Sequence, residues 1–159
     1  MTAEFVYPGV FAPEVQYLGG NECAVFRDDG FTIIKGSKAP EEWRTVSLGE
    51  DICSVFHDGT HLGFITRSSD AEHKYCMSIY STNGNLISSV YADTPYERVR
   101  VCGDRVILSS HTEFSVLSTK GVCRFRGRLK EGNISDALKI GKKRLLILTD
   151  QKMEVITLH

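Results

Sequence analysis

Two histidines, His57 and His61, have the spacing that most resembles a metal site, because Asp58 lies between them and His61 is four positions from His57. Imidazole and carboxylate groups are common ligands of transition metals. Asp58-Gly59 is also a typical hairpin turn, so the two histidines should flank a turn rather than share one face of a helix. The pattern favours two solvated turn histidines over a metal site, and no cofactor is predicted.

A basic stripe near the C-terminus is the second candidate. Four basic side chains alternate along the sequence, so in an extended strand they should project from one face, opposite Cys123 and Phe125; they are Arg124, Arg126, Arg128 and Lys130. Such a stripe could bind an anionic partner. A charged outer strand more often serves to prevent pairing with other chains, and the sequence favours that second role.

Charge is distributed unevenly along the chain, although the net charge is only −1. Residues 120–144 carry nine basic and two acidic side chains, whereas residues 1–60 carry four basic and ten acidic ones. The two regions could attract each other within one ring or between copies. Nucleic acid is not favoured as a partner, because the basic region lacks interleaved aromatic residues and any recognised nucleic-acid module.

Catalytic motifs are absent from the sequence. It contains no G-x-S-x-G, H-E-x-x-H or P-loop pattern. The adjacent carboxylates Asp28-Asp29 and Glu41-Glu42 fall in a predicted turn and a predicted loop, where solvated side chains are expected. The chain is therefore predicted not to be an enzyme.

Five cysteines are spaced 21 to 30 residues apart, with no pair at the spacing of zinc ligands. Each lies in or beside an apolar run, so buried, unpaired thiols are expected. One or two disulfides are the alternative, which an oxidising compartment would permit.

The elements that must position these residues are predicted to be short β-strands. Apolar residues recur with a period of two in short runs, and turn signals such as Asp29-Gly30 and Asn83-Gly84 separate the runs. Only residues 38–43, which include Trp43, retain a helical pattern. This tryptophan is expected to pack between sheets, and the alternative is an exposed anchor for recognition. No window is long and apolar enough for a membrane span, and the N-terminus lacks a signal-peptide pattern.

The runs group into four units, which cover residues 15–48, 52–91, 97–128 and 134–158. The first strands of successive units lie 37, 47 and 35 residues apart, close to the roughly 40–50 residues of one propeller blade. We therefore expect an all-β, β-propeller-like fold of three four-stranded antiparallel blades plus an incomplete fourth, in a single domain over residues 1–159.

The incomplete fourth unit raises the question of closure, because propellers commonly complete the last blade with a strand from the opposite terminus. Residues 4–7 are the candidate closing strand. If they do not serve, the exposed ends require another copy of the chain, missing upstream blades or another partner.

Several stretches resemble an uncharacterised bacterial family, largely clostridial, whose members have an N-terminal membrane helix followed by an extracytoplasmic propeller-like domain. The matching stretches are His61-Leu-Gly-Phe-Ile65, residues 75–84, residues 121–127, and the closing pattern of residues 133–158. The resemblance implies an extracytoplasmic location, with the chain as the C-terminal part of an anchored protein whose membrane helix lies upstream of it. A cytoplasmic location is the alternative, and no functional residue carries over.

These observations favour a non-enzymatic binding or scaffold module that uses rim loops to bind an unknown protein or extracellular ligand. Two alternatives stay open. The first is an enzyme whose site is assembled from separate blades in the central channel. The second is a self-associating structural module.

Overall fold

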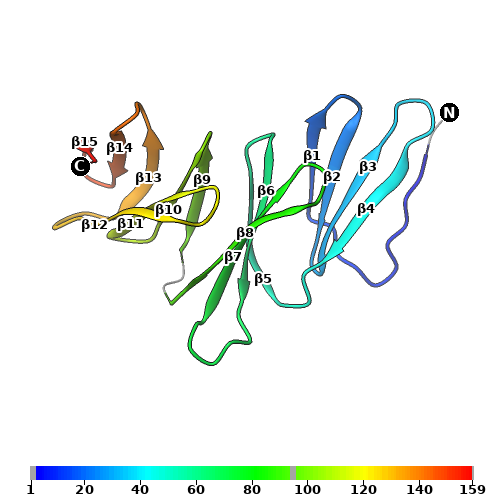
Figure 1. The fold of residues 1–159 in the computed structure, drawn as a ribbon, viewed down its shortest axis with the longest axis horizontal. Helices are drawn as coiled ribbons and strands as arrows, with labels where there is room; N and C mark the ends of the chain where they lie inside the picture. The colour runs from blue at the N-terminus through cyan, green and yellow to red at the C-terminus, as the bar shows by residue number, and fades with distance from the viewer. Residues whose placement is uncertain (1–2, 94–95, 159) are drawn as a thin grey trace.

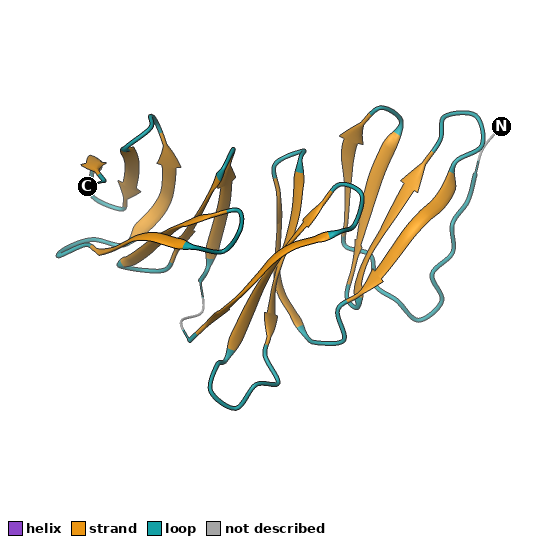
Figure 2. Cartoon of the chain, viewed as in Figure 1, coloured by secondary structure: helices purple, strands orange, loops and turns teal. Residues whose placement is uncertain are grey.

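The computed structural model describes residues 3–93 and 96–158. All regular secondary structure in this part of the chain is β-strand (Figure 2). The described residues form no helix that could span a membrane.

Fifteen strands form four antiparallel sheets, and each sheet keeps its strands in sequence order. The first sheet contains β1 (Glu14–Gly19), β2 (Glu22–Arg27), β3 (Gly30–Lys35) and β4 (Glu41–Ser47). The second contains β5 (Ile52–His57), β6 (His61–Arg67), β7 (Tyr75–Ser81) and β8 (Leu86–Ala92). The third contains β9 (Arg98–Cys102), β10 (Arg105–Ser109), β11 (Glu113–Ser118) and β12 (Cys123–Arg128). The fourth contains β13 (Ile134–Lys139), β14 (Arg144–Thr149) and β15 (Met153–Thr157).

This arrangement confirms the predicted three four-stranded sheets followed by a three-stranded one. Residues 41–43 begin β4 instead of continuing a helical pattern, and Trp43 is 57% exposed with the Lys35 amine 5.0 Å from its ring centre. Trp43 is therefore not packed between sheets, because it lies on the outermost strand of the first sheet.

The four sheets follow one another along an arc, with the N-terminus and β15 at opposite ends (Figure 1). Each first strand is innermost, and β5 and β13 both lie beside β9. In the second sheet the middle strands bury both faces because that sheet is packed between two others. On β6, Phe64 belongs to the core shared with the first sheet and Ile65 to the core shared with the third.

Three apolar cores hold successive sheets together. Between the first and second sheets, the Phe31 and Phe64 rings stack with centroids 5.2 Å apart. The next core includes Met77 and Leu108, and the last includes Val116 and Ile147. Each core joins neighbouring sheets, so the packing repeats along the arc.

The N-terminal segment covers the outer face of the first sheet. Tyr7 places its ring 5.5 Å from the Arg27 guanidinium, and the Asp28 N–H donates to the Phe11 carbonyl at 2.9 Å. Residues 4–7 form no strand, so the prediction that they could complete the fourth sheet is wrong. The reason is geometric: the arc is open, and this segment instead shields the first sheet at the opposite end (Figure 1).

The cysteines differ in burial, and all five are free thiols. Cys76 is buried as expected, whereas Cys53 and Cys123 are exposed and the other two are half-buried. Both exposed cysteines lie where strand pairing shifts register, at Ile52/Ser54 and opposite Val116/Leu117. The expectation of burial is therefore wrong for these two, because a bulge changes the face onto which a side chain projects.

Candidate functional site

The turn that joins β5 to β6 contains the two candidate metal-binding histidines. Asp58 accepts backbone N–H groups of Thr60 at 2.9 Å and His61 at 2.7 Å, as expected for an aspartate that closes a hairpin turn. Burial acts to raise the pKa of the Asp58 carboxyl, but the hydrogen bonds from Thr60 and His61 outweigh it and lower this pKa overall. The His61 Nδ1 atom lies 3.2 Å from Asp58 Oδ2.

His57 faces a different carboxylate, because its Nε2 atom lies 3.2 Å from Glu14 Oε1 on β1. Among residues 3–93 and 96–158, no group of three or more His, Cys, Asp or Glu side chains is arranged to hold a metal ion. A metal site at His57 and His61 therefore stays a prediction, because the described residues offer these two histidines no suitable third ligand.

A groove of about 510 Å³ runs along the inner strands, at the position of the central channel in which an enzyme site could be assembled from separate sheets. Its lining includes Glu14, His57 and Arg100. Arg100 Nη2 lies 2.6 Å from Asp136 Oδ2, which links the third sheet to the fourth. The Glu14 carboxylate therefore faces His57, and the Asp136 carboxylate faces Arg100. Each of these two pairs joins one sheet to the next.

The basic stripe is divided by the bulge in β12. Phe125 pairs with Val116, whereas Cys123 pairs with Leu117, so Arg124 occupies the extra position. Cys123 thus shares a face with Arg126, contrary to the prediction that it would project from the opposite face, because the inserted residue changes the alternation. Arg128 forms an ion pair with Glu113, and Lys130 lies beyond the end of β12.

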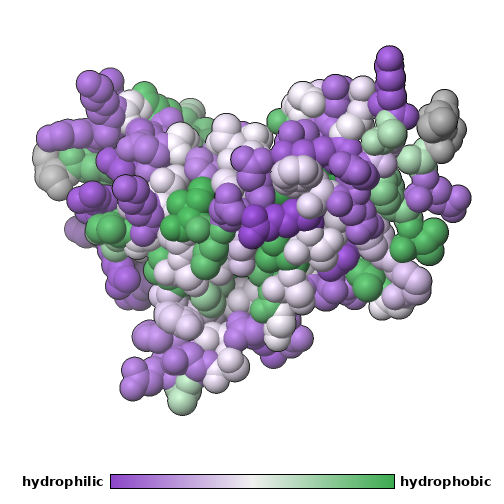
Figure 3. Space-filling view, turned by 45° about the vertical axis from the view of Figure 1, so that its right-hand side comes forward, coloured by the Kyte–Doolittle hydropathy of each residue, from purple (hydrophilic) through white to green (hydrophobic). Residues whose placement is uncertain are grey.

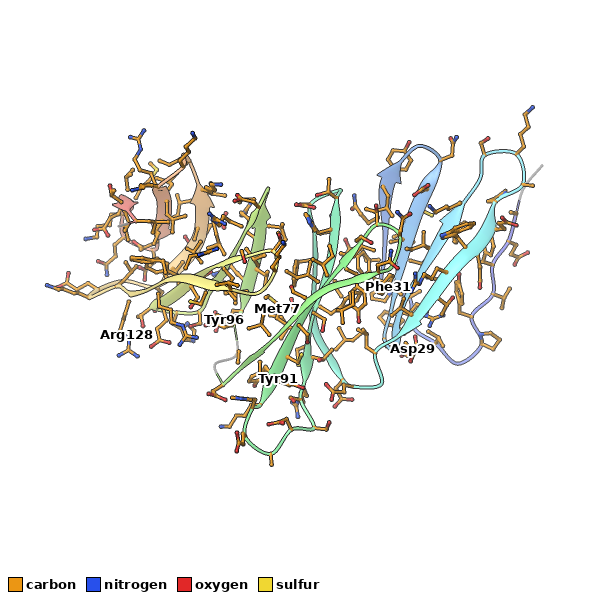
Figure 4. All side chains as sticks on the ribbon, in the orientation of Figure 1. Asp29, Phe31, Met77, Tyr91, Tyr96 and Arg128 are labelled. Carbon is orange, nitrogen blue, oxygen red and sulfur yellow. The ribbon has the colours of Figure 1, made fainter. Side chains whose placement is uncertain are left out.

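An inter-sheet cleft of about 220 Å³ lies between the second and third sheets. Met77, Tyr91 and Tyr96 mark its position in Figure 4, on both sides of the junction. The apolar lining consists of Met77, Val90, Ala92, Leu108 and Leu117. The polar residues on its lining are His73, Asp93, Ser115, Cys123 and Arg126.

His73 and Asp93 form an ion pair on the second-sheet side of the cleft, with Nδ1 and Oδ1 3.0 Å apart. The imidazole also stacks on Tyr91, with centroids 5.3 Å apart and an interplanar angle of 19°. The hydrogen bond to Asp93 raises the pKa of His73 above its ordinary value of 6.5. The Asp93 carboxylate balances the charge of the protonated imidazole, so the pair adds little net charge to this side of the cleft.

Arg126 supplies the cation on the third-sheet side. The neighbouring Cys123 side chain raises the pKa of the Arg126 guanidinium further above its ordinary range. Within the described part of the chain, Arg126 forms no ion pair, whereas Arg128 on the same strand is paired with Glu113. Nearby, the Tyr96 hydroxyl lies 3.1 Å from Ser115 Oγ. A cleft with an apolar floor and a guanidinium at its edge suits a ligand that joins an apolar group to an anion.

Sequence reasoning identified Arg126 but not His73, Asp93 or Tyr96. His73 precedes β7, Asp93 follows β8, and Tyr96 precedes β9, so no local motif contains them. Only the pairing of sheets brings them to one cleft. A search for polar residues just outside the ends of apolar strands could have proposed them, without showing which ones meet.

We predict that replacing Asp93 with asparagine lowers the pKa of His73 toward 6.5, because the hydrogen bond that favours the imidazolium loses its charged acceptor. In the unaltered chain the pKa of His73 is raised, so the His73–Asp93 pair stabilises the fold fully at pH values below the pKa of histidine in the unfolded chain. This contribution fades as the pH rises through the folded pKa. An NMR titration of the histidine ring measures the change, and an unaltered His73 pKa in Asp93→Asn would contradict the assignment.

Comparison with known proteins places the fold. A model of the family described as "Family of unknown function (DUF5711)" matches residues 1–158. Among curated proteins, none matches the chain.

Solved structures, among them the propeller-like proteins Hsv2 and BamB, superpose on most of this chain. Kluyveromyces lactis Hsv2 gives a TM-score of 0.66 at 17% identity, over 92% of this chain and 48% of that one. Moraxella catarrhalis BamB gives 0.65 at 13% identity, over 94% and 47%. The computationally designed Ika4 protein gives 0.58 at 9% identity, over 91% and 89%. The chain thus has a propeller-like fold and spans about half the length of Hsv2 and BamB.

Proposed function

The chain belongs to the DUF5711 family of unknown function. We propose that it is a non-enzymatic module that binds a partner protein. The inter-sheet cleft receives one apolar side chain of the partner, and Arg126 pairs with an anionic group beside that side chain. The observation that carries this proposal is the Arg126 guanidinium, which forms no ion pair with a described residue and lies at the edge of a cleft whose floor is apolar. At about 220 Å³, the cleft is smaller than typical small-molecule pockets of roughly 300–1,000 Å³. Its size suits a single anchor side chain of the kind that dominates protein interfaces.

The rigid frame supports the same role. Met77 and Leu108 belong to the core that joins the second and third sheets, so the cleft floor is held by packing on both sides. His73, Asp93 and Tyr96 line the cleft from positions just outside strand ends, where a rigid scaffold commonly presents recognition residues. A preformed cleft of this kind reduces the ordering cost of binding.

The test uses N-acetyl-phenylalaninate, which joins an aromatic ring to a carboxylate. We expect NMR shift changes at Met77, Tyr96 and Arg126, with weak, millimolar binding. Arg126→Gln should weaken binding about tenfold to a hundredfold, since it removes a charge-assisted hydrogen bond worth roughly 1.5–3 kcal/mol.

Arg124→Gln is the matched control, because Arg124 lies on the same strand but does not line the cleft. It should leave binding unchanged. Equal weakening in the two variants would point to nonspecific charge attraction, and shift changes confined to another surface would reject the cleft as the site.

We further propose that the module works outside the cytoplasm, as the C-terminal part of a bacterial protein with a membrane helix upstream. The support is the resemblance carried by residues 61–65, 75–84 and 121–127. Fractionation of cells that express the natural gene, followed by protease treatment of intact spheroplasts, tests this location. Protection of the domain from protease would contradict it.

An enzyme is the second candidate, because the inner groove pairs charged side chains from separate sheets. His57 and Glu14 come from the second and first sheets, and Arg100 and Asp136 from the third and fourth. If this groove is catalytic, a broad hydrolase and lyase panel should detect turnover that His57→Gln abolishes. Turnover of that kind would also overturn the non-enzymatic proposal.

A further inference from the structure

We propose that the outer face of the fourth sheet docks on the outer face of the first sheet in a second copy of this chain, so that two copies close one ring. The same junction forms twice, related by a two-fold axis, which closes the assembly and prevents further growth. The inference rests on the two end faces of the arc and is independent of the inter-sheet cleft.

The outer face of the fourth sheet is apolar. Its inner face packs on the third sheet through residues that include Leu145 and Ile147. The strand register places five further apolar side chains on the opposite face: Leu138, Leu146, Leu148, Met153 and Val155. Met153 is 63% exposed and Val155 is 54% exposed. Apolar side chains on both faces are a property of sheets that pack between two neighbours.

The outer face of the first sheet provides a second apolar surface at the other end of the arc. Val15 and Tyr17 project from β1 and are 62% and 66% exposed. The N-terminal covering segment adds Val6 and Phe11, which are 71% and 69% exposed. Figure 3 turns this end forward and shows apolar residues at the surface there. An exposed patch of this kind commonly marks an interaction surface.

Charged residues at the two ends lie on the same rim. The β13–β14 turn and the loop before β4 both lie at the top of Figure 1. The turn leads into three exposed basic residues, Lys142, Lys143 and Arg144, and β4 begins with exposed Glu41 and Glu42. None of these five forms an ion pair with a described residue. Lys38 partly offsets the acidic charge, so the two ends place a basic group and an acidic group on the same rim, where opposite charges favour association.

A second copy fits these faces better than an unrelated partner does. One chain covers 47–48% of the BamB and Hsv2 chains, so it supplies about half of a ring. Packing on the exposed face of the fourth sheet requires another apolar surface, and β1 together with the N-terminal segment that covers the rest of the first sheet presents one through Val15, Tyr17 and Phe11. Residues 1–60 and 120–144 also carry opposite charge excesses, as an association between unlike ends requires.

The test is the solution mass of the 159-residue chain, by light scattering and sedimentation. We expect twice the chain mass of 17.7 kDa in low salt, and dissociation as salt screens the rim charges. Val155→Glu should raise the dissociation constant about a hundredfold or more, since it buries an unpaired charge in the junction.

Val122→Glu is the matched control, because Val122 is 50% exposed but lies on neither end face. It should leave the dimer intact. Unchanged circular dichroism and thermal midpoint in Val155→Glu separate loss of association from loss of folding, and Met153→Glu provides a second variant if Val155→Glu unfolds.

Charge reversal tests the orientation. Lys142→Glu with Lys143→Glu should weaken the dimer about tenfold, and Glu41→Lys with Glu42→Lys in the partner copy should restore it. A single-chain mass at roughly millimolar concentration in low salt would overturn the proposal. Open polymers would also overturn it. So would a fourth sheet whose outer face becomes covered only when further upstream sequence is joined to the chain.

Discussion

Replacing Phe64 with alanine is expected to lower the free energy of unfolding by about 3–5 kcal/mol. Phe64 is fully buried between the first and second sheets, and its ring centre lies 5.2 Å from that of Phe31 and 5.6 Å from that of Phe26. Its loss leaves a cavity that the surrounding rings cannot fill without leaving their own contacts. Because a domain of this size has a total stability of roughly 5–15 kcal/mol, much of it should disappear.

Urea denaturation followed by circular dichroism measures the change, as a lower midpoint with a similar slope. Leu86→Ala is the control, since Leu86 is a strand residue of the second sheet that is 56% exposed. It should cost less than about 1 kcal/mol. Equal losses at the two positions would mean that the packing between the first two sheets is not what stabilises the chain.

Replacing Gly30 with alanine should lower the free energy of unfolding by about 2–4 kcal/mol. Gly30 has a φ of 152°, where other residues are strained, and it begins β3 opposite Ser47. A Cβ atom here would lie 2.0 Å from the Val46 carbonyl oxygen, which is backbone and cannot rotate away. The β3–β4 pairing would therefore have to open.

Gly103→Ala separates the clash from the general cost of a positive φ. Gly103 has a φ of 62°, and a Cβ atom there would meet nothing within 4 Å. We expect this control to cost about 1 kcal/mol. The same urea experiment compares the two, and a Gly30→Ala loss no greater than the Gly103→Ala loss would show that the backbone approach at Val46 is unimportant.

The strands and turns were predictable because their causes are local. A period of two in apolar residues needs only the pleat of a strand, and Asp29-Gly30 or Asn83-Gly84 needs only the positive φ that glycine tolerates. The incomplete fourth sheet was predictable for the same reason, since the sequence contains only three apolar runs after residue 133.

The candidate site was less predictable, because its residues meet only through packing. Arg126 was identified from alternation, but the bulge at Arg124 changed which residues share its face. A one-residue insertion has no signature in the hydrophobic period, so Cys123 was assigned to the wrong face. Similarly, nothing local shows that Tyr7 would lie on Arg27 instead of extending the fourth sheet.

In the folded chain the two histidines face separate carboxylates, and the basic stripe is divided so that Arg126 lines the inter-sheet cleft. The sequence alone determined that they lie on short strands and turns of a repeated all-β fold, because side-chain alternation and turn chemistry act over a few residues. Only the tertiary structure decided that His57 meets Glu14, that Arg126 lines a cleft with His73, and that both ends of the arc expose apolar faces. Those relations depend on how whole sheets stack, which is set by long-range packing between residues far apart in the chain.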